Sequence, residues 1–277
     1  MFNKFTVLIS IYKNNSITEV INLVKSIKSQ NLYPGEIIFI YDGPIKIEID
    51  KIIKSLKNLK IIYNKKNIGL GASLRKGVLA AKYGIIIRSD VDDISIPSRF
   101  KELIKTYTIN KNVDVIGSLQ EEIYNKKSYV KILPYENEMI RKKLIYRNYI
   151  NHPTVLLKKK KILQAGNYEN VGKYLHCNNF EDYYLWLKML KINAIFKNIP
   201  RVLVKSRINK NFYYRREGKK IISNYYTFLK KIHKEKIITT QKFYLNFVIR
   251  TLIYILPTTL FRIFFNFFLR KQYKLYN

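Results

Sequence analysis

The chain of 277 residues has few acidic residues and almost no cysteine. Its 19 aspartate and glutamate residues face 52 lysine and arginine residues, which gives a formal net charge of +33. The single cysteine, Cys177, excludes an internal disulfide framework and is typical of a reducing compartment. Hydrophobic residues make up 47% of the chain, enough to bury a large core. We therefore expect one or two globular domains with a basic surface.

Two targeting signals are also missing from the sequence. The apolar run from Phe5 to Tyr12 is short, and no small-residue cleavage site follows it, so we expect no signal peptide. The apolar tail from Phe243 to Leu269 is cut by Arg250, Pro257 and Arg262. Its uncharged runs are shorter than the roughly 20 residues of a spanning helix, so we expect it not to cross a bilayer.

The few acids that are present form a cluster after an apolar run. Ile85 to Ile87 is β-branched throughout and predicts a short buried strand, and Asp90, Asp92 and Asp93 follow it directly. Three carboxylates this close repel one another unless a cation lies between them. Oxygen ligands at this spacing suit Mg²⁺ or Mn²⁺, which proteins commonly hold together with substrate phosphates. The cluster therefore predicts a metal site for a nucleoside diphosphate.

Strand and helix patterns alternate through the first hundred residues. Continuous apolar runs predict strands at residues 5–11, 36–41, 59–63 and 85–87. Helical spacing of apolar residues predicts helices at residues 16–30, 45–56 and 72–82. This alternation indicates a parallel sheet whose ligands bind beyond the carboxyl ends of its strands. Four polar residues fall at those ends and are expected to share one cleft: Tyr12, Asp42, Asn67 and Asp90.

The pattern changes to shorter segments after Arg99. We expect strands at residues 113–117, 129–133 and 153–157, and a helix at 136–146. A further helix follows two adjacent acids, Glu181 and Asp182, and carries an apolar face through Leu190. Because no long linker separates these segments from the first hundred residues, we expect both parts to share one body.

Both acid groups have a simpler alternative interpretation as helix starts. Asp92 and Asp93 would cap a helix that begins near Ile96, although this leaves Asp90 without a role. Glu181 and Asp182 would complement the dipole of the helix that they open, although capping needs only one of them.

Six stretches, in this order and at these separations, together resemble one family. They are Val7 to Tyr12, Ile38 to Pro44, Asn67 to Gly77, Arg88 to Arg99, Asn151 to Thr154 and Glu181 to Leu187. The chain resembles the family 2 glycosyltransferases with a GT-A fold, especially bacterial exopolysaccharide and capsule transferases of the amylovoran-biosynthesis type. The resemblance implies an α/β fold with a Rossmann-like, mostly parallel sheet. It also implies a catalytic domain at residues 1–205, with a donor half at 1–99 and an acceptor half at 100–205, followed by a basic helical region at 206–277.

The resemblance also assigns roles to individual residues. Donor binding falls to Ser10, Tyr12, Asp42, Asn67, Gly69, Arg88, Asp90 and Asp92, of which Asp90 and Asp92 would hold Mn²⁺ or Mg²⁺, with Asp93 beside them. Asp182 would be the general base, with Glu181 next to it, and Asn151, His152 and Trp186 would line the acceptor side. A histidine before proline is equally compatible with a purely structural turn.

The implied reaction is transfer of a hexose or N-acetylhexosamine from a nucleotide sugar, with UDP as the expected nucleotide. One base and one metal site suffice for inversion at the anomeric carbon, because the metal neutralises the leaving diphosphate. The expected acceptor is a lipid-linked saccharide of a cell-surface polysaccharide. We expect the enzyme in the cytoplasm at the inner face of the bacterial plasma membrane. The sequence does not predict its oligomeric state.

Three features of the sequence depart from the family or remain open. Ser73-Leu74-Arg75 replaces the Ala-Arg-Asn of many relatives, so a ligand role for Arg75 is in doubt. We also find no clear late histidine ligand for the metal.

The segment Arg207 to Gly218 is basic and aromatic and is interpreted either as a lid over the diphosphate or as a disordered loop. From Arg201 to Asn277 there are 18 basic and 2 acidic residues, so the tail is either an interfacial anchor on anionic lipid or a pair of helices packed on the body.

Two rival functions account for part of the sequence. A Rossmann dehydrogenase would explain Gly69 and Gly71 before a helix, but Leu74 stands where its third glycine is required. A basic nucleic-acid-binding protein without catalytic activity would explain the charge, but it leaves both acid groups without a role. We therefore expect no nucleic-acid partner.

Overall fold

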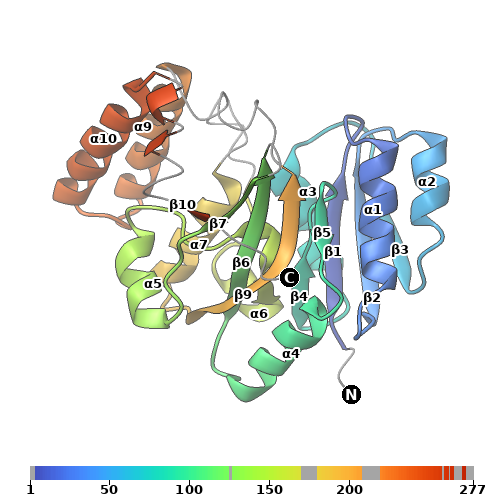
Figure 1. Cartoon of the computed structure of the whole chain (residues 1–277). Coiled ribbons are helices and arrows are strands. Elements are labelled where there is room, and N and C mark those ends of the chain that lie inside the picture. The colour runs from blue at the N-terminus through green and yellow to red at the C-terminus, as the bar shows by residue number, and fades with distance from the viewer. Residues whose placement is uncertain are drawn as a thin grey trace.

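The fold is built around one twisted sheet with helices on both faces (Figure 1). The computed structural model describes residues 4–124, 127–169, 180–207, 219–257, 259–261, 263–264 and 270–272. Within these ranges, the sheet has ten strands, and its main path runs in the order β10-β7-β6-β8-β4-β1-β2-β3.

The first half of the chain forms the parallel part of this sheet. Its strands are β1 (Thr6–Ile11), β2 (Glu36–Asp42), β3 (Leu59–Asn64) and β4 (Ile85–Arg88). Its helices are α1 (Ile17–Lys28), α2 (Ile47–Ile53) and α3 (Leu70–Ala80). β2 and β4 both pair with β1 in parallel, and β3 pairs with β2 in parallel. The predicted alternation of strands and helices is confirmed, and the strand ends converge as expected.

The rest of the chain, from β5 onward, adds mainly antiparallel strands to the same sheet. They are β5 (Asp93–Ser95), β6 (Val115–Tyr124), β7 (Lys127–Lys131), β8 (Leu156–Lys158), β9 (Phe196–Arg207) and β10 (Arg270–Gln272). β8 joins the halves by pairing antiparallel with both β4 and β6. β9 runs parallel to β6 and antiparallel to β5, so it closes over the acid cluster that follows β4.

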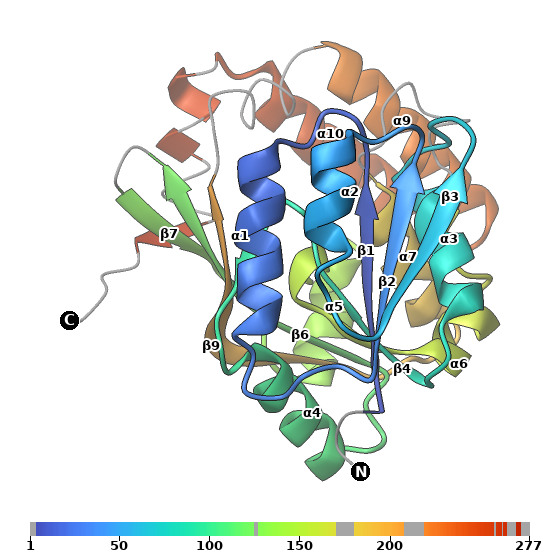
Figure 2. The same ribbon diagram turned by 90° about the vertical axis from the view of Figure 1, so that its right-hand side faces the viewer.

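Helices of the second half are α4 (Arg99–Ile109), α5 (Asn137–Leu144), α6 (Lys159–Gln164), α7 (Glu181–Lys191), α9 (Lys219–Lys234) and α10 (Thr240–Ile255). Two hydrophobic clusters lie on opposite faces of the sheet. One includes Val20 of α1, Ile49 of α2 and Phe100 of α4, and the other includes Leu74 of α3 and Trp186 of α7. Figure 2 shows α1 and α2 in front of β1 to β3, with α3 and α7 behind them.

One local prediction is wrong and one alternative interpretation is excluded, and both concern residues next to the site. The strand expected from Pro153 begins only at Leu156, because His152–Thr154 form a short 3-10 helix, η1. Asp92 and Asp93 do not cap a helix: Asp93 opens β5, and α4 begins at Arg99 after Ser98. The alternative in which this acid pair serves only as a helix cap is therefore excluded.

Candidate active site

The aspartate group after β4 has the geometry of a cation site. One carboxylate oxygen from each of Asp90, Asp92 and Asp93 lies within 4.8 Å of the others. Asp92 is exposed, Asp90 is partly exposed and Asp93 is buried, so the group opens to solvent on one side. Burial and the neighbouring carboxylates of Asp90 and Asp92 hold the pKa of Asp93 well above its ordinary value. A divalent cation would relieve this repulsion, so the three residues fit a metal ion.

Two buried arginines hold this aspartate group in place. Arg88, at the end of β4, forms an ion pair with Asp90. Arg99 is fully buried, and its Nη1 donates to the hydroxyls of Ser89 (3.0 Å) and Ser95 (2.7 Å), on either side of the acids. Because one guanidinium bonds both sides of the loop, the carboxylates stay close despite their repulsion.

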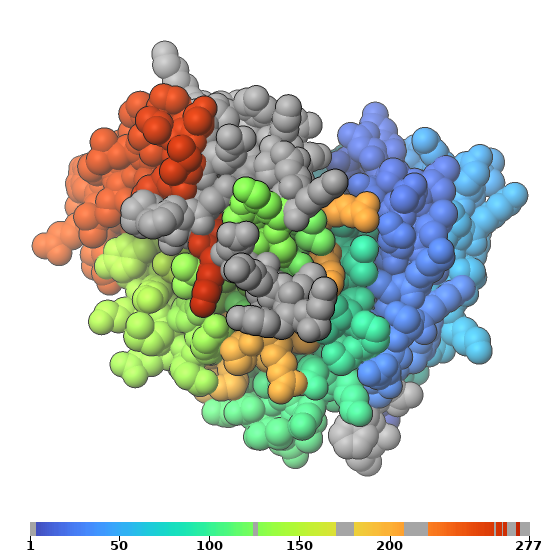
Figure 3. All heavy atoms as spheres, viewed as in Figure 1, coloured from blue at the N-terminus to red at the C-terminus, as the bar shows by residue number. Residues whose placement is uncertain are grey.

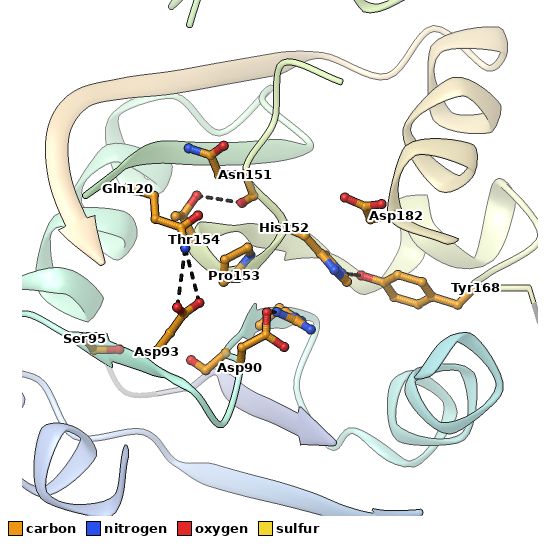
Figure 4. Close-up of polar contacts among 12 residues, drawn as sticks. Asp90, Asp93, Ser95, Gln120, Asn151, His152, Pro153, Thr154, Tyr168 and Asp182 are labelled. Atoms are coloured by element: carbon orange, nitrogen blue, oxygen red, sulfur yellow. Dashed lines mark hydrogen bonds and ion pairs between the residues drawn. The ribbon is translucent and has the colours of Figure 1, made fainter. Parts of the chain in front are cut away.

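Arg99 also connects the aspartate loop to the second half of the chain. Its Nη2 donates to the carbonyl oxygens of Arg88 (2.5 Å) and Pro153 (2.6 Å). Gln120 of β6 adds a second link, because its Nε2 lies 3.4 Å from both carboxylate oxygens of Asp93. Figure 4 shows this arrangement, with Asp93 below Gln120 and Asp90 beside it. Sequence reasoning missed Gln120, which follows a register shift in the pairing of β6 with β9 that no local pattern indicates.

The Asn151–Thr154 segment fills an interruption in the sheet. The β6–β9 pairing shifts register on either side of Leu119. The amide nitrogen of Ser118 donates to Thr154 Oγ1 (2.9 Å), and the carbonyl of Ser118 accepts from Asn151 Nδ2 (3.1 Å). These side chains thus satisfy backbone groups at the irregular part of β6. Asn151 is buried, so its assignment to the acceptor side stays a prediction.

Figure 4 shows His152 pointing from this segment toward Tyr168, a residue that the sequence analysis did not single out. Its Nε2 lies 2.8 Å from the hydroxyl of Tyr168, and both side chains are buried. Burial and the nearby Arg88 hold the pKa of His152 well below its ordinary value, so the ring is neutral at physiological pH. Trp186 is fully buried and packs edge-on against this ring at 5.9 Å between centroids. Any effect of Trp186 on an acceptor would therefore act through His152.

Tyr168 is positioned by α3, a helix of the first half. Arg75 Nη1 donates to the carbonyl oxygens of Gly166 (3.0 Å) and Tyr168 (3.3 Å), and Asn167 Nδ2 donates back to the carbonyl of Arg75 (3.3 Å). Gly71 allows the close approach, because a Cβ at this position would lie 2.2 Å from the carbonyl oxygen of Glu169. The open question about Arg75 thus has a structural answer: it holds the segment that carries Tyr168.

The acid pair lies at the start of α7, and Figure 4 shows Asp182 on the other side of His152 from Asp90. Asp182 is partly exposed, and its Oδ2 accepts a hydrogen bond from Asn148 Nδ2 (2.8 Å). Glu181 is buried, and its Oε2 has no hydrogen-bond partner among the described residues. Burial, and next the charge of Asp182, raise the pKa of Glu181 to about 8. At neutral pH, Glu181 is therefore mostly protonated, and Asp182 is the more accessible base.

Some of the residues predicted to bind the nucleoside are buried and others are exposed. Asp42 is buried, and its two oxygens accept from the amide nitrogens of Ile68 (2.8 Å) and Gly69 (3.0 Å). Gly69 has a φ of 90°, which an L side chain rarely adopts, and it leads directly into α3. Asp42 therefore shapes the turn that contains Asn67.

The remaining predicted donor positions differ in exposure. Tyr12 and Asn67 are exposed, whereas Ser10 at the end of β1 is partly buried. Arg207 ends β9, but residues 208–218 of the predicted lid lie outside the described residues. His233 does not approach the aspartate group; its Nε2 lies 3.1 Å from Thr240 Oγ1.

Comparison with known proteins gives a consistent family. The family described as "Glycosyl transferase family 2" matches residues 6–165. The chain is 33% identical over 262 residues to the UDP-Gal:alpha-D-GlcNAc-diphosphoundecaprenol beta-1,3-galactosyltransferase of Escherichia coli, covering 92% of this chain and 93% of that protein. It is 29% identical over 261 residues to the amylovoran biosynthesis glycosyltransferase AmsE of Erwinia amylovora, covering 91% and 94%.

Solved structures support the fold. The crystal structure of TarS from S. aureus aligns with a TM-score of 0.59 at 15% identity, over 77% of this chain and 38% of the TarS chain. The match confirms the predicted GT-A type of α/β fold. The family match and the two bacterial relatives argue against both rival interpretations, a dehydrogenase and a non-catalytic nucleic-acid-binding protein. The chain is a glycosyltransferase and belongs to glycosyl transferase family 2.

Proposed function

We propose that this enzyme transfers a hexose or N-acetylhexosamine from a UDP-sugar to a lipid-linked saccharide of a cell-surface polysaccharide, with inversion and with a divalent metal. One observation carries the proposal: the aspartate group fits a cation, and Asp182, a member of a separate acid pair, lies on the other side of His152 from Asp90 (Figure 4). The E. coli relative supports the substrate classes, because its name gives UDP-Gal as donor, a diphosphoundecaprenol-linked sugar as acceptor and a beta linkage as product.

The donor side of the proposal rests on the ends of β1 to β4. Tyr12 and Asn67 are open to a nucleoside, Asp42 and Gly69 shape the neighbouring turn, and Ser10 is partly buried at the end of β1. Buried Arg88 would act on the donor through its ion pair with Asp90. Asp90, Asp92 and Asp93 would hold Mn²⁺ or Mg²⁺, which would neutralise the charge of the leaving diphosphate.

The acceptor side rests on α7 and η1. Asp182 takes the proton of the acceptor hydroxyl, because it is the partly exposed member of the acid pair and Asn148 orients it. Glu181 remains protonated below about pH 8, so it adds no second negative charge beside Asp182. Neutral His152, held by Tyr168, is placed to hydrogen-bond a sugar hydroxyl. Attack from this side while the diphosphate leaves on the other inverts the anomeric centre.

We further place the reaction in the cytoplasm at the inner face of the bacterial plasma membrane. A lipid-linked acceptor requires contact with a bilayer, and the basic tail favours an anionic surface. The single cysteine agrees with a reducing compartment.

The test separates donor binding from catalysis in two variants. Asp92→Ala is expected to weaken Mn²⁺-dependent UDP binding at least about tenfold by calorimetry, because it removes an exposed ligand oxygen. Asp182→Asn is expected to bind UDP and Mn²⁺ normally but to lose about 10²- to 10⁴-fold in transfer rate, the typical contribution of a general base. Asp50→Asn is the control, because among the described residues this carboxylate on α2 pairs with Lys54 and Tyr41 and not with the proposed site.

Three results would contradict the proposal. They are full transfer activity in Asp182→Asn, metal-independent UDP binding in the unmodified protein, and an NMR coupling constant that shows retained configuration in the product.

A further inference from the structure

The outer face of α10 carries an unusual concentration of exposed apolar side chains. Eight of the 20 exposed large hydrophobic side chains in the described structure lie between Tyr244 and Ile263. Six of them are on α10 itself: Tyr244, Leu245, Val248, Ile249, Leu252 and Ile255, each between 45% and 65% exposed. Their spacing of three or four residues places them on one side of the helix. An apolar stripe of this kind marks a surface that contacts another body.

The opposite side of α10 is already fixed to the protein. Phe243 packs edge-on against Tyr226 of α9 at 5.9 Å, and buried Asn246 donates to the carbonyl of Ile145 (3.2 Å). Arg250 donates to the carbonyl of Tyr146 (3.2 Å). The helix therefore packs on the body, as one interpretation of the tail expected, and still presents a second apolar face outward. Figure 3 shows the C-terminal helices as a lobe at one edge of the molecule, away from α1 and α2.

Positive charge borders the apolar stripe. No aspartate or glutamate occurs from Lys236 to Asn277. A cavity of about 570 Å³ between α9 and α10 is lined by aromatic rings, including Phe243 and Tyr244, and by the exposed Lys230 and Lys234. Tyr244 belongs to both the cavity and the stripe, so the two features are continuous. An apolar pocket with ammonium groups at its rim suits a phosphate headgroup and the first part of its acyl chain.

We propose that the outer face of α10 and this lysine-bordered cavity dock on the surface of an anionic phospholipid bilayer. The helix lies along the interface, since within the described residues no helix has the length and hydrophobicity needed to cross a membrane. A second copy of the chain fits this face poorly, because both partners would carry a net charge of +33. Anionic lipid supplies both an apolar layer and the opposite charge.

The docking face is rigidly connected to the acid pair of the active site. Phe228 of α9 stacks on Phe180, the residue before Glu181, at 4.8 Å between ring centroids. Glu235, just after α9, accepts from the hydroxyl of Tyr184 (2.6 Å), and its carbonyl accepts from Lys191 Nζ (2.7 Å). Docking through α10 would thus hold α7 at a fixed height above the bilayer. Only this consequence rests on the proposed lipid-linked acceptor.

The test measures binding of the full chain to vesicles of phosphatidylglycerol and phosphatidylcholine by cosedimentation, without any nucleotide sugar. The double variant Leu252→Glu/Ile255→Glu is expected to bind at least about tenfold more weakly than the unmodified chain, because it places charge in the apolar stripe. The matched control is Ile47→Glu/Ile109→Glu, whose side chains are 71% and 72% exposed on α2 and α4. It should bind like the unmodified chain. Thermal unfolding verifies that each variant is folded.

A charge-reversal pair tests the electrostatic half of the proposal. Lys230→Glu/Lys234→Glu is expected to weaken binding to the mixed vesicles, and Lys51→Glu/Lys57→Glu, at exposed sites on and beside α2, is expected to leave it nearly unchanged. Three outcomes would each overturn the proposal. The unmodified chain could bind pure phosphatidylcholine as tightly as the mixed vesicles, or the stripe variant could bind as tightly as its control. Light scattering could also show a dimer that only the stripe variant abolishes. Such failures leave the transferase proposal intact, because vesicle binding involves no sugar donor.

Discussion

The proposed donor half and the proposed acceptor half of the chain place their side chains in different ways. In the donor half, parallel strands deliver Tyr12, Asp42 and Asp90 to one edge of the sheet simply by ending there. In the acceptor half, side chains are placed by hydrogen bonds between residues far apart in sequence, such as Thr154 with Ser118 and Arg75 with Tyr168. Under the proposed function, the donor site would therefore follow from regular secondary structure, whereas the acceptor site would depend on tertiary contacts.

The largest expected effect is on the free energy of unfolding, because the buried carboxyl of Glu181 destabilises the folded protein when it is charged. Burial and Asp182 raise the folded-state pKa of Glu181 from 4.5 to about 8. Stability from the protonated form is fully present below about pH 4.5 and is lost progressively as the pH rises toward 8. Glu181→Gln keeps the shape without the charge, so at about pH 8.5 it should be more stable by a few kcal/mol, on the order of 2–4.

Calorimetric melting between about pH 5 and 9 tests this difference between the halves. The unmodified enzyme should lose stability relative to Glu181→Gln as the pH rises. Glu48→Gln, on the exposed face of α2 in the donor half, should follow the unmodified enzyme throughout. Parallel pH profiles for Glu181→Gln and the unmodified enzyme would show that the acid pair carries no such cost.

A smaller effect is expected where the halves touch. Gly71→Ala places a Cβ 2.2 Å from the carbonyl oxygen of Glu169, so the backbone of the acceptor half must shift. The cost should be about 1–3 kcal/mol in the free energy of unfolding, as for other overpacked sites. Gly84→Ala is the matched control, because its Cβ meets no atom within 4 Å. It should be neutral or stabilising by up to about 1 kcal/mol. Similar urea-unfolding midpoints for both variants would mean that the backbone near Glu169 accommodates the added Cβ without a measurable loss of stability.

This difference also explains what the sequence could and could not predict. The alternation of apolar runs gave the strands and helices of the donor half, and the aspartate cluster after β4 was identifiable from its spacing. The strand was predicted to begin at Pro153 because the run from Thr154 to Leu157 is strand-like, and this run hid a 3-10 turn whose Thr154 hydroxyl accepts from the amide of Ser118. Tyr168 was missed because its position depends on Arg75, 93 residues away, which no local pattern encodes.

The smallest effect is expected for Tyr168→Phe, which tests directly whether the two proposed halves act on different substrates. The variant removes the hydroxyl that contacts His152 and keeps the ring, so the loss should be about 1 kcal/mol. Because the donor half is untouched, kcat/KM for the acceptor should fall about three- to tenfold while KM for the donor stays constant. Tyr33→Phe is the control, since within the described part of the chain its hydroxyl bonds the backbone of Lys57 in the proposed donor half. If Tyr168→Phe instead raised KM for the donor alone, the His152–Tyr168 pair would belong to the nucleotide side of the cleft, and the division of labour between the halves would have to be redrawn.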